Sequence, residues 1–163
     1  MKVRTMAINA VIAALYLAVT ALIAPFGFTN VQFRVSEMFN HLVVFNKKYI
    51  VGIVLGVFIS NLLLSTLGWF DLTFGVAHSI ISLTATIVAC KFIKGSIQRM
   101  IANTLIFTFT MFIIAIDLKL AIGLPFWIGW PSLAISEFIV MAIGIPVMHA
   151  LNKRIDFKRL IEE

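Results

Sequence analysis

Three ionisable residues, Arg34, Glu37 and His41, stand at helical spacing in the otherwise mostly apolar segment "VQFRVSEMFNH". Side chains three or four positions apart share one face of a helix. A guanidinium can hold a carboxylate, a carboxylate accepts N–H donors, and an imidazole donates or accepts a hydrogen bond. The pattern therefore predicts either recognition of a polar ligand or an ordinary Arg34–Glu37 ion pair, and the two are compatible.

Other polar and aromatic residues fall at a similar depth of the predicted membrane spans, toward the outer side. Ionisable groups inside a membrane are costly and normally face the bundle interior or a water-filled cavity. Glu137 carries the most weight, because it lies in an apolar helix with no basic residue near it. The convergence predicts a pocket open to the outside. The candidate substrate-binding residues are Gln32, Arg34, Glu37, Asn61, Trp69, Asp71, His78, Trp127, Trp130 and Glu137.

Several of these candidates also have simpler interpretations. Asp71 precedes a predicted helix, and an N-cap is its expected role when it is considered alone. Trp127 and Trp130 are suited to the aromatic belt at a membrane surface. His41 and His78, taken singly, are typical of hydrogen-bonded packing residues. The grouping of these residues at one depth, more than any one of them, indicates a site.

The composition identifies a membrane protein. Of the 163 residues, 61% are hydrophobic and 12% are charged, whereas about 25% of a soluble domain is charged. The mean hydropathy is +1.07. The 13 Lys and Arg outnumber the 7 acidic residues, an excess that in membrane proteins marks cytoplasmic ends rather than nucleic-acid binding. The single cysteine, Cys90, excludes an internal disulfide and provides no metal-site spacing.

A helix needs about 20 mostly apolar residues to cross a bilayer. Short breaks containing Pro, Gly, Lys or Asp divide the chain into six such segments, of which the second is the shortest and most polar. No soluble domain fits between them, so residues 1–163 are expected to form one domain, an all-α compact bundle. The six predicted transmembrane helices are about 5–25, 31–46, 49–67, 72–92, 98–120 and 128–150.

The placement of positive charge supports this topology. If the chain crosses the membrane six times, every Lys and Arg from Lys2 to the C-terminus lies on the same side as the two termini. The exceptions are Arg34 and Lys119. Positive residues favour the cytoplasmic side, so both termini are predicted to be cytoplasmic. If 31–46 did not cross, the termini would lie on opposite faces and the charge rule would fail. The weak second segment is therefore counted as a span.

The chain contains none of the usual motifs for ATP hydrolysis or hydrolytic chemistry. G-x-x-x-x-G-K-[ST], H-E-x-x-H and G-x-S-x-G are all absent, and no catalytic residue, metal site or cofactor is predicted. Six spans without a visible internal repeat are few for a secondary transporter. These features favour a small binding subunit that a partner protein energises.

Small residues form stripes on two predicted helices. Such stripes let another helix approach closely in lipid. Gly52, Gly56 and Ser60 in the third span are expected to pack inside the bundle. The stripe in the first span is expected to face a partner protein. It comprises Ala7, Ala10, Ala14, Ala18 and Ala21, of which Ala10, Ala14 and Ala18 are the predicted interface residues.

Three segments carry a family resemblance over nearly the whole chain. "VQFRVSEMFNHL", "GWFDLTFGVAHSIISL" and "PSLAISEFIVMAIGIPV" resemble the QueT family, substrate-binding S components of energy-coupling factor (ECF) transporters for queuosine precursors. The size, the six spans and the alanine stripe are similar too. The resemblance implies a multi-pass protein of the bacterial plasma membrane that joins a transmembrane T component and two ATPases. It also implies toppling in the membrane to carry ligand inward.

The implied ligands are 7-deazaguanines such as 7-aminomethyl-7-deazaguanine. The guanine-like edge presents N–H donors that a carboxylate accepts, and the flat ring can stack on an aromatic side chain. The cationic aminomethyl group favours another carboxylate. Glu37, Asp71 and Glu137 are the candidates for these acidic roles, and Asn61 and Gln32 are candidates for contacting the ring carbonyl.

Alternatives remain open from the sequence. Arg34 either contacts the ligand or orients Glu37. An S component for a different vitamin is the main alternative. A nickel or cobalt S component is disfavoured, because that group resembles chains beginning Met-His and this one begins "MKVR". A small intramembrane enzyme, with His78 and the acids as catalytic or metal ligands, is a further alternative. A purely structural subunit is disfavoured by the acids within the spans.

Overall fold

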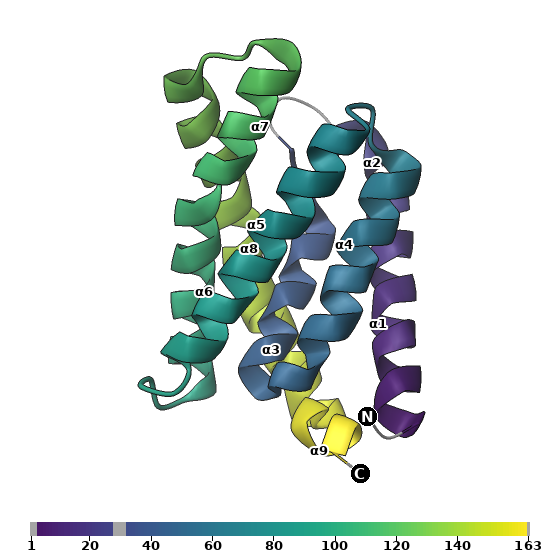
Figure 1. The fold of residues 1–163 in the computed structure, drawn as a ribbon. Helices are drawn as coiled ribbons and strands as arrows, with labels where there is room; N and C mark the ends of the chain where they lie inside the picture. The colour runs from purple at the N-terminus through teal and green to yellow at the C-terminus, as the bar shows by residue number, and fades with distance from the viewer. Residues whose placement is uncertain (1–2, 28–31, 163) are drawn as a thin grey trace.

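The computed structural model describes residues 3–27 and 32–162, which form helices and no strands (Figure 1). Lys2 and Val31, which belong to the predicted charge pattern and second span, lie outside the described residues. The helical segments are α1 (Val3–Leu22), α2 (Ala24–Gly27), η1 (Val35–His41), α3 (Leu42–Phe45), η2 (Lys47–Tyr49), α4 (Ile50–Leu64), α5 (Trp69–Ala89), α6 (Ser96–Thr110), α7 (Phe112–Ile122), α8 (Phe126–Ile155) and α9 (Phe157–Glu162).

Five stretches within these residues are long and apolar enough to cross a membrane, which confirms an all-α, multi-pass protein. They are α1, η2 with α4, α5, α6 with α7, and α8. The fourth of these stretches is interrupted at Met111, between α6 and α7. The six-helix prediction is wrong as a helix count, because the second predicted span does not form a membrane-length helix.

That second segment, 31–46, forms the 3₁₀ helix η1 and the single α-helical turn α3. At about 2.0 Å and 1.5 Å per residue these extend roughly 20 Å, which is short of the roughly 30 Å hydrocarbon core. The segment packs against α1 and α8. Irregular backbone at membrane depth is tolerated where protein surrounds it. The sequence signal was weak because this segment is shielded from lipid by its neighbours.

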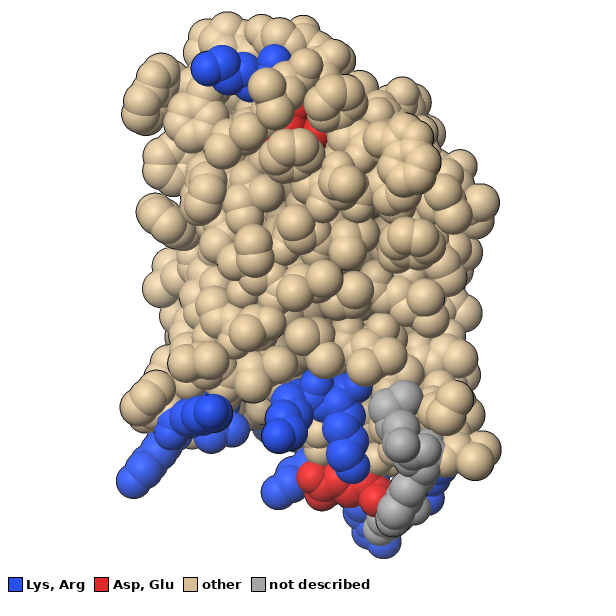
Figure 2. All heavy atoms as spheres, in the orientation of Figure 1, with Lys and Arg blue, Asp and Glu red and all other residues tan. Residues whose placement is uncertain are grey.

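Both ends of the described chain nevertheless lie at the same end of the bundle (Figure 1). The Thr5 hydroxyl in α1 donates a hydrogen bond to the Ile161 carbonyl in α9, at 3.3 Å. Lys and Arg side chains gather at this end, and a band without charged atoms covers the middle of the visible face (Figure 2). We call the end of the bundle where Lys and Arg gather the basic end. The charge rule predicts that it is cytoplasmic.

Cysteine labelling in intact cells tests this orientation. In a Cys90→Ser background, Thr66→Cys is expected to react with an impermeant thiol reagent, because Thr66 is exposed in the α4–α5 turn away from the basic end. Lys48→Cys and Lys94→Cys are expected to react only after the cells are permeabilised. External labelling at Lys48 would reject cytoplasmic termini. Thr66 is preferred to Gly68, whose φ of +58° strains any side chain.

Glycines bring α1 and α4 into direct contact. A Cβ at Gly52 would lie 2.6 Å from the Asn9 carbonyl oxygen, and one at Gly56 would lie 2.7 Å from Cβ of Tyr16. The Gly52 N–H also donates to Oδ1 of Asn9 at 2.7 Å. These glycines therefore pack inside the bundle, as predicted, and they hold Tyr16 toward the bundle centre.

The alanine stripe lies on the opposite side of α1. All five alanines, Ala7, Ala10, Ala14, Ala18 and Ala21, are exposed, whereas Asn9, Ala13 and Tyr16 on the other face are buried. The stripe is therefore open to a neighbour outside the bundle. Its predicted role as a partner interface stays a prediction.

Candidate functional site

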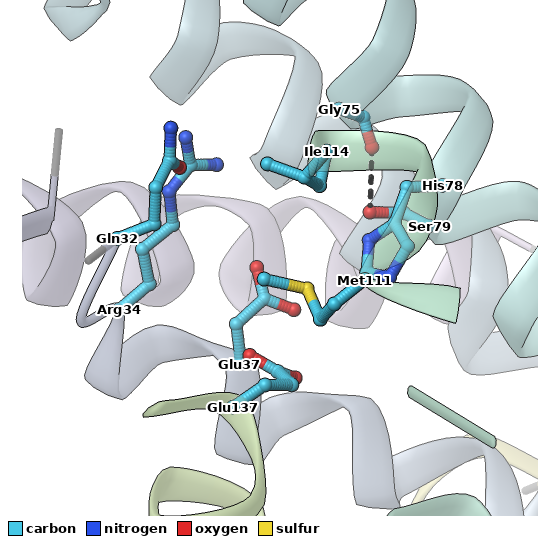
Figure 3. A pocket seen from close by; sticks show the side chains of 9 residues that line it. All are labelled: Gln32, Arg34, Glu37, Gly75, His78, Ser79, Met111, Ile114 and Glu137. Carbon is cyan, nitrogen blue, oxygen red and sulfur yellow. Dashed lines mark hydrogen bonds between the residues drawn. The ribbon is translucent and has the colours of Figure 1, made fainter. Parts of the chain in front are cut away.

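A small cavity lies inside the half of the bundle away from the basic end. Its volume is about 10 Å³, room for about one water molecule. The segment leading into η1, η1 itself, α5, α7 and α8 all contribute to it (Figure 3). Five of the predicted site residues line it. The lining residues are Gln32, Arg34, Glu37, Gly75, His78, Ser79, Met111, Ile114 and Glu137.

Glu37 is held in place by two donors. It is 5% exposed, and its Oε1 accepts a hydrogen bond from the Tyr16 hydroxyl at 2.6 Å. Its Oε2 accepts one from Nδ2 of Asn40. Buried polar groups are nearly always satisfied in this way. Tyr16 and Asn40 therefore orient Glu37, and the sequence analysis identified neither of them.

Glu137 is buried, and one of its carboxyl oxygens accepts no hydrogen bond from the described residues. It is 2% exposed, and its Oε1 has no hydrogen-bond partner among the described residues. Figure 3 shows its carboxyl group close to that of Glu37, and the Met111 side chain pointing toward the Glu37 carboxyl group. A buried polar atom without a partner is costly. An oxygen in this position is suited to accept an N–H donor from a ligand.

Arg34 joins three parts of the fold at the edge of the cavity. Its Nε donates to the Gly27 carbonyl at 3.1 Å, and one terminal nitrogen donates to Oδ1 of Asn61 at 3.1 Å. Its other terminal nitrogen forms an ion pair with Asp71 at 3.9 Å. Arg34 therefore ties the chain segment before η1 to α4 and α5.

Asp71 differs from its expected role as an N-cap. Gly68 is the N-cap residue of α5, and Asp71 lies in the first turn, where the helix dipole favours a carboxylate. Its Oδ2 accepts a hydrogen bond from the Ser65 hydroxyl at 2.6 Å, and its backbone carbonyl accepts one from Asn61 at 2.9 Å. Asp71 and Asn61 thus lie behind Arg34 and outside the cavity lining.

A second buried aspartate, Asp117 in α7, was missed by the sequence analysis. It lies beside Asp71, is 0% exposed, and neither of its carboxyl oxygens has a hydrogen-bond partner among the residues described. An acid inside the predicted span 98–120 was itself a signal. Asp117 and Asp71 together place two carboxyl groups near one guanidinium.

The histidines considered as candidates, His41 and His78, are both buried but differ in position. His41 bonds through Nε2 to the Met141 carbonyl at 2.9 Å and through Nδ1 to the Asn103 side chain at 3.1 Å, so it serves packing. His78 lines the cavity, and its Nε2 bonds to the Thr110 hydroxyl at 3.1 Å. No group of three or more metal-ligating side chains occurs within the described ranges.

The tryptophans lie outside the cavity lining. Trp69 and Trp127 are each 78% exposed, and Trp130 is half-buried, with its indole N–H donating to the Phe109 carbonyl at 3.2 Å. Their roles in ligand binding stay predictions.

Four residues that line the cavity were not predicted from the sequence. Gly75, Met111 and Ile114 have no ionisable or polar side chain that would mark them as site residues. The fourth, Ser79, donates its hydroxyl hydrogen bond within α5 to the Gly75 carbonyl (Figure 3).

Comparison with known proteins places the chain among transporters. The model of a family described as QueT transporter matches residues 6–153. A protein named Queuosine precursor transporter QueT, from Lactococcus lactis subsp. cremoris (strain MG1363), is 35% identical over 159 residues, which cover 92% of this chain and 93% of the relative. No solved structure gives a significant match. The matched range contains every residue that lines the cavity, and neither match is described as an enzyme.

Proposed function

Because this chain belongs to the QueT transporter family, we propose that it is the substrate-binding subunit of an ECF-type importer for a queuosine precursor. The ligand is a 7-deazaguanine such as 7-aminomethyl-7-deazaguanine. The observation that carries this proposal is the Glu137 carboxyl group, buried at the cavity with an oxygen that lacks a partner among the described residues.

The cavity chemistry fits the polar edge of a guanine-like ring. Such an edge presents adjacent N–H groups, and a carboxylate accepts them in a paired arrangement. Glu137 has the open oxygen, whereas both oxygens of Glu37 already accept donors. Glu137 is therefore the first contact in this proposal, and Glu37 is a second carboxyl group beside it, held by Tyr16 and Asn40.

Binding requires the cavity to expand. Ligand pockets typically occupy about 300–1,000 Å³, whereas this cavity holds about 10 Å³. Met111 lines the cavity together with both glutamates, and its side chain points toward Glu37 (Figure 3). A methionine side chain is flexible enough to change rotamer readily. Met111 lies between α6 and α7, where the helix is interrupted. Its displacement is the first movement that ligand entry requires.

Calorimetry with purified protein tests the proposed ligand. Binding of 7-aminomethyl-7-deazaguanine, with no binding of adenine as a control base, is the expected result. Mass spectrometry of ligand retained during purification supplies a second measurement. Retention of a different vitamin, with no response to the deazaguanine, would support the alternative of another S-component specificity.

The proposed partners are a transmembrane T component and two ATPase subunits in a bacterial plasma membrane. The exposed alanine stripe on α1 supports this part of the proposal, because small residues permit close helix approach in lipid. In the proposed cycle the partners' ATPases supply the energy that moves bound ligand inward.

Substitution in the stripe separates assembly from ligand binding. Ala14→Leu is expected to reduce copurification with the T component and uptake by at least tenfold, because it adds bulk at the proposed contact. Ligand affinity of the isolated subunit is expected to stay within twofold. Ala150→Leu, at an exposed alanine of α8, is the matched control. Normal assembly in Ala14→Leu would exclude this position from the interface.

A further inference from the structure

A groove separate from the central cavity opens at the basic end of the bundle. It lies between α3 with η2 on one side and the α5–α6 turn on the other, and α9 contributes one edge. Its volume is about 370 Å³. The proposed uptake function uses none of the residues that line it.

The groove has apolar walls and a basic rim. Val43, Val44 and Ile87 contribute the apolar surface. Lys47 and Lys91 stand exposed on opposite sides of the opening. An acyl chain would contact the first surface and a phosphate group the second, so the groove has the polarity of a lipid at the membrane surface.

Arg99 completes the rim in a fixed orientation. Its Nε donates to the Ile93 carbonyl at 2.8 Å. No salt bridge reaches Arg99, Lys47 or Lys91 within the part of the chain that the structure describes. The one acid in the lining, Glu162, accepts a hydrogen bond from the Asn46 side chain at 2.9 Å. The three cations therefore give the opening a net positive charge.

We propose that this groove binds an anionic phospholipid from the leaflet at the basic end. Its phosphate lies between Lys47, Lys91 and Arg99, and its acyl carbons lie against the apolar walls. Basic pockets between membrane helices are suited to lipid head groups, and a guanidinium recognises phosphate oxygens through several N–H donors. Figure 2 shows how strongly Lys and Arg gather at this end of the molecule.

The polarity and charge of the groove favour a lipid over a partner helix, because a partner segment would have to place apolar side chains against the walls. A partner segment matching the rim would also have to carry acidic groups at that position. An anionic phospholipid supplies both, with its acyl carbons against the apolar walls and its phosphate group at the basic rim.

Native mass spectrometry of the full chain in detergent tests the proposal. Phosphatidylglycerol is expected to bind at least tenfold more tightly than phosphatidylcholine with the same acyl chains. Lys47→Gln/Lys91→Gln is expected to weaken phosphatidylglycerol binding on the order of 10- to 30-fold, since each cation near an anionic lipid contributes roughly fivefold. Lys48→Gln/Lys94→Gln removes the same charge from the same end but outside the groove lining, and is expected to change binding less than threefold.

Cys90 provides a second readout, because it is half-buried in the groove lining. In nanodiscs, phosphatidylglycerol is expected to slow its reaction with a soluble maleimide in the parent and in Lys48→Gln/Lys94→Gln, but not in Lys47→Gln/Lys91→Gln. If the two double variants lost equal amounts of phosphatidylglycerol binding, general surface charge would explain the effect and the proposed site would be rejected. Equal binding of phosphatidylcholine, or of glycerol phosphate alone, would overturn the lipid assignment. Both results are independent of deazaguanine binding.

Discussion

Glu137→Gln is expected to weaken binding of 7-aminomethyl-7-deazaguanine by about one to two decades. The substitution keeps the shape of the side chain but replaces an acceptor oxygen with a donor nitrogen, so it cannot accept two N–H groups. Loss of one hydrogen bond to a charged group costs roughly 1.5–3 kcal/mol. Calorimetry on the purified, folded variant measures the change.

The control for this prediction is Ser136→Ala, the neighbouring buried position of α8, which is outside the cavity lining. It is expected to leave the affinity within about twofold of the parent. If Glu137 served packing alone, Glu137→Gln would lower thermal stability while the folded fraction bound normally. Parental affinity in Glu137→Gln would remove this residue from the contacts and make Glu37 the leading acceptor.

Arg34→Met is expected to lower the free energy of unfolding by about 3–5 kcal/mol, the usual cost of leaving one partner of a buried ion pair alone. The substitution removes the charge opposite Asp71 and the hydrogen bonds to Gly27 and Asn61. Denaturant unfolding of the detergent-solubilised protein measures the loss. Lys119→Met, at the exposed cation of the same end, is expected to change stability by no more than about 0.5 kcal/mol.

A double substitution identifies the cause of that loss. Arg34→Met/Asp71→Asn is expected to recover at least about 1 kcal/mol relative to Arg34→Met, because it no longer buries an unpaired carboxylate at Asp71. If the double variant were less stable than Arg34→Met, the Asp71 pair would contribute little. Arg34 would then stabilise the fold through Gly27 and Asn61.

Much of the architecture was predictable because the bilayer acts on residue types directly. Five of the six apolar runs predicted as spans correspond to membrane-length stretches. The distribution of Lys and Arg predicted that both ends of the described chain lie together. The rule that ionisable groups in a span face the interior selected Glu37, His78 and Glu137 for the cavity. The same rule, applied fully, would also have placed Asp117 in the bundle interior, where it is buried outside the cavity lining.

What the sequence determined by itself is the membrane class, most of the long apolar helices and the residues too polar to face lipid. Only the tertiary structure decided that residues 35–45 form η1 and α3, since neighbouring helices shield them from lipid. It also decided that Asp71 pairs with Arg34, while Tyr16 holds Glu37. Periodicity places a side chain on a face of its own helix. The partner it meets depends on how separate helices pack, and that is set by close contacts such as Gly56 against Tyr16.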